Sequence, residues 1–118
     1  MGIIDEIQKD GWIRNHSIPC VNEHLEENTV QTIINPQITK LQNDGAKDDE
    51  FIEQISESLQ EHRDVDDISK IIQCITQKMI HDFEDGDILM NKPFLSIAAF
   101  TVFGKSILLQ GKAAGYIS

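Results

Sequence analysis

The stretch DVDDISKIIQCITQKMIHDF, residues 64–83, decides the fold class of this chain. Its apolar residues recur at steps of three and four, the spacing that places them along one face of an α-helix. They are Val65, Ile68, Ile71, Ile72, Ile75, Met79 and Phe83. Asp64 carries a side chain suited to cap the first turn. The stretch therefore predicts a long amphipathic helix in an all-α fold.

The same spacing, with turn residues between, predicts shorter helices on both sides of this stretch. We expect them over about residues 3–10, 17–27, 29–43, 48–61 and 93–109. Gly11 ends or bends the first, Ser17 is placed to cap the second, and Pro36 must kink the third. Asp48 and Asn91 are placed to cap the fourth and the last.

The segment from Pro93 to Leu109 is apolar nearly all round, so its helix should lie at the centre of the molecule. The resulting fold is a compact bundle of about five or six helices. Because 118 residues leave little room for a second core, we expect a single domain over residues 1–118. The alternative for residues 97–109, which are rich in Ile and Val, is a buried strand or a C-terminal hairpin.

The two cysteines, Cys20 and Cys74, belong to no metal or redox motif, and we expect them to be free, buried thiols in a reducing cytoplasm. A bridge would require the fold to bring their Cα atoms within about 7 Å. Asp5 and Glu6 stand where a secretory signal needs basic residues, so export by that route is not expected. The longest apolar run falls short of the roughly 20 residues that span a bilayer.

Motifs for catalysis, cofactors and metals are missing from the sequence. There is no phosphate-binding glycine loop, no nucleophile elbow and no register that makes an EF-hand. No two histidines stand four residues apart, and a zinc site needs three or four converging ligands. We therefore expect no metal, no cofactor and no catalytic residue, although a small enzyme with a dispersed site stays an alternative.

The informative feature is the distribution of charge, because the net charge of −10 is concentrated. Residues 44–67 hold ten of the 20 acids and two bases, whereas residues 88–118 hold three lysines and no acid. On the helix over 48–61, four acids stand four residues apart and form a carboxylate stripe, which costs a few tenths of a kcal/mol per like-charged pair. A solvated helix face is one interpretation. A surface that meets a basic partner is the other, with candidate residues Asp49, Glu53, Glu57, Glu61, Asp64, Asp66 and Asp67.

A protein is a better partner for such a surface than nucleic acid, because phosphate repels carboxylate. In its size, acidity, helical pattern and carboxylate segment from Asp44 to Asp67, the chain resembles the small acidic immunity proteins of bacterial contact-dependent growth inhibition systems. The resemblance implies a cytoplasmic inhibitor that binds one cognate basic toxin domain, often a nuclease, and blocks its active site. Two further alternatives are a DNA-mimic inhibitor and a helical regulatory or adaptor protein that binds through an apolar groove.

Overall fold

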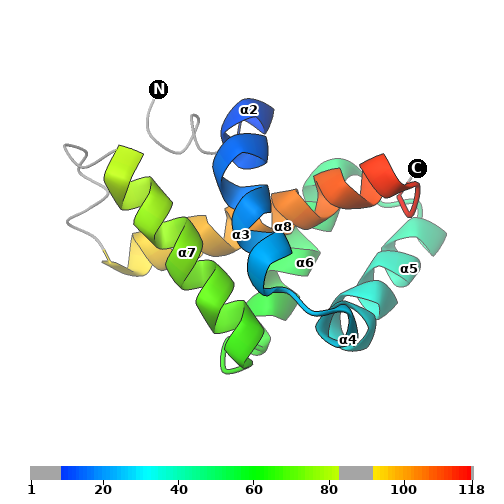
Figure 1. Ribbon diagram of the computed structural model, residues 1–118. Coiled ribbons are helices and arrows are strands. Elements are labelled where there is room, and N and C mark those ends of the chain that lie inside the picture. The colour runs from blue at the N-terminus through cyan, green and yellow to red at the C-terminus, as the bar shows by residue number, and fades with distance from the viewer. Residues whose placement is uncertain (1–8, 83–91, 118) are drawn as a thin grey trace.

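The computed structural model describes residues 9–82 and 92–117, and in the second range the side chains from residue 95 onward. Within these ranges the chain forms five continuous helices and no strand, which confirms the all-α prediction (Figure 1). The first helix consists of α2 (Asp10–Trp12), the π-helical η1 (Ile13–Ser17) and α3 (Ile18–His24), and the second of α4 (Glu27–Thr29), η2 (Val30–Ile34) and α5 (Asn35–Asn43). The others are α6 (Asp48–Glu61), α7 (Asp66–Asp82) and α8 (Lys92–Ala114).

Each of the first two helices widens into a π turn just before a proline. Segment η1 ends two residues before Pro19, and η2 ends two residues before Pro36. Proline has no N–H to donate, and its ring crowds the carbonyl group four residues earlier, so the helix opens at that point and then continues. The kink predicted at Pro36 therefore takes the form of a widened turn.

Gly11, predicted to end or bend the first helix, does not end it, and the prediction that Ser17 caps a second helix is wrong. Gly11 lies inside α2, and the helix runs without a break from Asp10 to His24. Ser17 has helical backbone angles, with φ −84° and ψ −49°, and makes no capping bond. Its side chain is fully buried instead and contacts α8. Neighbouring residues in the sequence give no sign of this contact.

Most other helix ends lie within a few residues of their predicted places. Helix α3 ends at His24, before the predicted residue 27, because Leu25 and Glu26 turn to extended backbone. Helix α6 begins at Asp48 with Lys47 as its N-cap, one residue before the predicted cap, and α7 begins two residues after Asp64. Residues 3–8 of the helix predicted over 3–10 and the predicted cap at Asn91 lie outside the described residues.

Helix α8 lies at the centre of the fold, as its composition predicts, and it packs against η1, α3, α6 and α7. Figure 1 shows it running behind α3 and α7. Its side chains at Ala99, Val102, Phe103 and Ser106 are completely buried. The strand predicted as an alternative for residues 97–109 is therefore wrong, because that stretch is helical throughout.

Helices α6 and α8 come close together at Gly104. A Cβ atom at this position would lie 2.9 Å from the backbone oxygen of Ile52 and 3.4 Å from the backbone nitrogen of Ser56. Such a short distance to backbone atoms leaves no room for any side chain other than hydrogen. Gly104 thus sets the spacing between the two helices.

A buried pair of hydroxyl groups joins the first helix to α8. The Oγ atoms of Ser17 and Ser106 are 2.5 Å apart, and both residues are fully buried. Ser106 donates its single proton to the carbonyl oxygen of Val102 at 2.8 Å. Ser17 must therefore be the donor in the pair, with the Ser106 oxygen as acceptor.

The expectation of two free thiols is also wrong, because Cys20 on α3 and Cys74 on α7 form a disulfide. Their Cα atoms are 5.8 Å apart, within the range that a disulfide spans. The packing of α3 against α7 produces this approach between residues that are 54 positions apart in the sequence. The bond closes a ring that contains the second helix and α6, and leaves α8 outside it.

Candidate functional site

The predicted carboxylate stripe lies on the solvent side of α6. All four of its acids, Asp49, Glu53, Glu57 and Glu61, are exposed. The opposite side of the helix is buried, with exposed fractions of 3% for Phe51, 1% for Ile55 and 0% for Leu59. Helix α6 is thus amphipathic in the way its sequence predicts, and the stripe is open to a partner.

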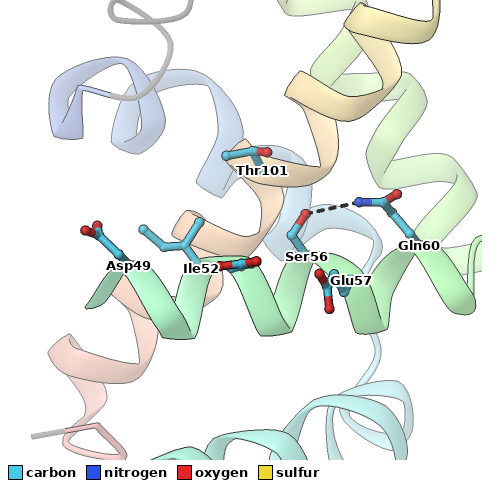
Figure 2. Close-up of a pocket in the computed structure, with 7 residues that line it drawn as sticks. Asp49, Ile52, Ser56, Glu57, Gln60 and Thr101 are labelled. Carbon is cyan, nitrogen blue, oxygen red and sulfur yellow. Dashed lines mark hydrogen bonds between the residues drawn. The ribbon is translucent and has the colours of Figure 1, made fainter. Parts of the chain in front are cut away.

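Three of these acids border a hollow between α6 and α8. Its volume is about 330 Å³. Figure 2 shows α6 along one side, with Thr101 of α8 facing it. The lining residues are Asp49, Ile52, Glu53, Ser56, Glu57, Gln60 and Thr101. We call this hollow the acidic groove.

The neutral polar groups of the acidic groove bind one another or the backbone. The amide of Gln60 donates to Ser56 Oγ at 3.5 Å, the bond drawn in Figure 2. The Thr101 hydroxyl donates to the backbone oxygen of Ile97 at 3.1 Å. By contrast, no base in the described ranges forms an ion pair with Asp49, Glu53 or Glu57. The carboxylates are the groups of the groove left to interact with a binding partner.

A second hollow, of about 580 Å³, adjoins the acidic groove and shares Asp49 and Ile52 with it. Two ion pairs lie in its lining. Lys112 Nζ lies 2.7 Å from Asp48 Oδ2, and Lys105 Nζ lies 3.3 Å from Asp10 Oδ1. These two lysines belong to the basic C-terminal segment, so their charge is used inside the molecule, beside the N-terminus of α6.

The remaining acids of the predicted interface divide into different roles. Asp66 accepts a hydrogen bond from Lys70 at 3.0 Å, and this bond, with the negative charge of Asp66, raises the pKa of Lys70. Asp67 accepts from the Thr29 hydroxyl at 2.9 Å and from the backbone N–H of Glu26 at 3.3 Å. Asp67 therefore anchors the connection between α3 and α4 to α7, a structural role.

Of the seven predicted interface residues, the structure brings together Asp49, Glu53 and Glu57. Glu61, on the last turn of α6, and Asp64, in the turn that follows, are exposed outside the groove lining. Four residues of the groove lining were not among the predicted site residues: Ile52, Ser56, Gln60 and Thr101. The stripe spacing locates α6, but no sequence signal shows which residue of α8 lies opposite to it.

A small polar cluster joins the first helix, at α2 and η1, to the end of α7. The indole N–H of Trp12 donates to Asp82 Oδ2 at 2.9 Å, and His16 Nε2 lies 3.4 Å from the same oxygen. The rings of Trp12 and His16 are 5.1 Å apart. Over residues 9–82 and 92–117, no three His, Cys, Asp or Glu side chains gather in a way that could hold a metal ion.

No family model, curated protein or solved structure matches this chain. In the part of the chain that the structure describes, no helix has the length and apolar character needed to cross a membrane. The acidic groove, bordered by three exposed carboxylates, is the candidate binding site of the described residues.

Proposed function

We propose that this chain is an immunity protein that binds a basic toxin domain through the acidic groove. The observation that carries the proposal is the gathering of Asp49, Glu53 and Glu57 around one hollow, without an ion pair to any base of the described ranges. Unpaired carboxylates in a concave surface attract a positively charged partner and select its orientation. The proposal assigns no catalytic residue, metal or cofactor to the chain.

The charge of the whole molecule supports the same partner. A net charge of −10 on 118 residues repels nucleic acid and membrane phosphates, and it accelerates encounter with a basic protein. Nuclease domains carry a basic cleft that holds phosphate, so carboxylates at the groove can occupy the place of phosphate oxygens. A nuclease toxin is therefore the partner that we propose.

The decisive variant reverses two groove charges, Glu53→Lys with Glu57→Lys. The matched control is Glu23→Lys with Glu26→Lys, two exposed acids outside the groove with the same change in net charge. The partner is the basic protein that copurifies in stoichiometric amount from the native host. Binding kinetics are measured at two ionic strengths, together with inhibition of the partner's nuclease activity.

We expect the groove variant to lose binding and inhibition, while the control keeps most of both. If the carboxylates lie at the rim of the interface, the association rate falls and added salt reduces the difference. If they are desolvated against Arg or Lys, the loss is about 2–5 kcal/mol and raises the dissociation rate. Equal effects of both variants would show that only net charge matters, and an unaffected groove variant would refute the site.

A cytoplasmic location belongs to this proposal, because a delivered nuclease acts on nucleic acid there. The Cys20–Cys74 disulfide weighs against it, since disulfides are rare in reducing compartments. Trapping free thiols with a maleimide in intact host cells separates the two cases. Two trapped thiols per chain support the cytoplasm, and none would move the proposed encounter to an oxidising compartment.

An adaptor function is the second candidate, and a different hollow favours it. This hollow, of about 270 Å³, lies between the second helix and the end of α8 and has mainly apolar walls, including Val30, Ile34 and Ile107. Tyr116, with an exposed fraction of 72%, stands at its edge. Binding through this hollow would be insensitive to salt and to the two groove charges, so the same kinetic experiment distinguishes the two functions.

A further inference from the structure

The disulfide between α3 and α7 is a covalent bond that a thiol reductant can break. Its two ends differ in exposure. Cys20 is 1% exposed and belongs to the hydrophobic core, whereas Cys74 is partly exposed at the edge of that core. A thiol reductant that approaches the folded protein therefore reaches Cys74 first.

While α3 remains packed, attack of a thiolate at Cys74 gives an energetically unfavourable product. The attacking thiolate forms a mixed disulfide with Cys74 Sγ, and the Cys20 sulfur leaves with the electron pair of the S–S bond. That sulfur is released as a thiolate in the apolar core, where desolvation disfavours the charged form. Attack at Cys20 requires the reductant to enter the packed core, so neither sulfur offers an easy route.

Several contacts hold α3 in place besides the disulfide. The buried Ser17–Ser106 hydrogen bond lies one turn before Cys20, and Ile13 and Val21 are buried on the same helix. On the other side, Asp67 binds Thr29 and the N–H of Glu26, just after α3. Movement of the first helix away from both α7 and α8 separates α3 from α7 and must break these contacts together, so it is a cooperative local opening.

We propose that the fold protects the Cys20–Cys74 disulfide, so that dithiol reductants reduce it only after α3 separates from α7. In the open state a dithiol attacks Cys74, Cys20 leaves as a thiolate and takes a proton from water, and a mixed disulfide remains. The second thiol of the reductant then attacks the mixed disulfide, forms a cyclic disulfide and releases Cys74. Two electrons pass from the dithiol to the protein, which gains two thiols.

This protection determines how long the oxidised protein persists in the presence of a dithiol. A folded molecule keeps its disulfide in the presence of a dithiol for as long as α3 stays closed, and a molecule that opens loses it. Reduction then removes the covalent link between α3 and α7, so reclosing depends on the non-covalent contacts alone. This inference is independent of the proposed function of the acidic groove.

The test measures the rate at which dithiothreitol reduces the oxidised, full-length protein, with free thiols counted by a maleimide gel shift. We expect reduction of the native protein to be at least about 100-fold slower than in denaturing urea. The native rate should rise steeply with sub-denaturing urea, because opening exposes surface. A native rate close to the denatured rate, or a slow rate that urea leaves unchanged, would overturn the proposal.

A variant away from the cysteines tests whether local opening of the first helix controls reduction. Ser106→Ala leaves the Ser17 hydroxyl without its buried acceptor and should accelerate reduction about 5- to 150-fold, which corresponds to about 1–3 kcal/mol at tenfold per 1.4 kcal/mol. Asp64→Ala, at an exposed turn residue, is the matched control and should leave the rate unchanged. Equal reduction rates for both variants would contradict control of reduction by opening of the first helix. The urea dependence of the wild-type rate gives an answer even where Ser106→Ala does not fold.

Discussion

Replacing Gly104 by alanine tests the close approach of α6 and α8 that forms the acidic groove. Alanine in place of glycine within a helix normally stabilises a protein by about 1 kcal/mol. At this position, however, the new Cβ lies 2.9 Å from the backbone oxygen of Ile52 and 3.4 Å from the backbone nitrogen of Ser56. Backbone atoms cannot rotate out of the way, so α6 has to move, and overpacking of this kind costs about 1–3 kcal/mol. The net expectation is a loss of up to about 2 kcal/mol in the free energy of unfolding.

The matched control is Gly11→Ala, because Gly11 also lies in a helix but has no atom within 4 Å of an added Cβ. The gain from helix propensity is common to both variants, so the difference between them, about 1–3 kcal/mol, isolates the steric overlap. Urea unfolding followed by far-ultraviolet circular dichroism measures both free energies. If Gly104→Ala is as stable as Gly11→Ala, then α6 and α8 do not approach at this distance, and the geometry of the acidic groove is wrong.

Two further predictions concern polar contacts between helices. Ser106→Ala should destabilise the protein by about 1–3 kcal/mol, because it leaves the fully buried Ser17 donor unsatisfied, whereas Ser17→Ala should cost only about 0.5–1.5 kcal/mol, because Ser106 keeps its bond to Val102. Urea unfolding of the two variants checks the order, and a reversed order would contradict the assigned direction of the bond. Asp67→Ala should cost about 1–3 kcal/mol because Asp67 anchors Thr29 and Glu26, while Asp64→Ala, in the exposed turn, should stay within about 0.5 kcal/mol of the wild type. Equal melting temperatures of these two variants would show that the Asp67 contacts do not stabilise the fold.

The long helix α7 could be predicted because its pattern is local. Ile68, Ile71, Ile75 and Met79 are all completely buried, as their steps of three and four require. Ser17 shows where local reasoning fails. A serine two residues before a proline favours an N-cap, but the hydroxyl of Ser17 binds a buried partner 89 residues away, and no short-range pattern encodes that partner.

The sequence did not predict the disulfide or the full lining of the acidic groove, and the reasons are related. Two cysteines 54 residues apart carry no signal of their distance in space, so the pairing follows only from the packing of α3 on α7. The stripe on α6 was predictable from spacing alone, but its separation into groove residues and structural residues was not. Asp67 and Glu57 look equivalent in the sequence, and only the position of Thr29 beside Asp67 distinguishes them.

The central position of α8 has a consequence for folding during synthesis. This helix is translated after the four other helices of residues 9–82, yet it packs against η1, α3, α6 and α7. While the ribosome makes residues 92–114, the earlier helices carry apolar faces that have no partner, a state that favours aggregation and chaperone binding. The core can close only when α8 has left the ribosome, so the release of this helix sets the time at which the described fold is completed.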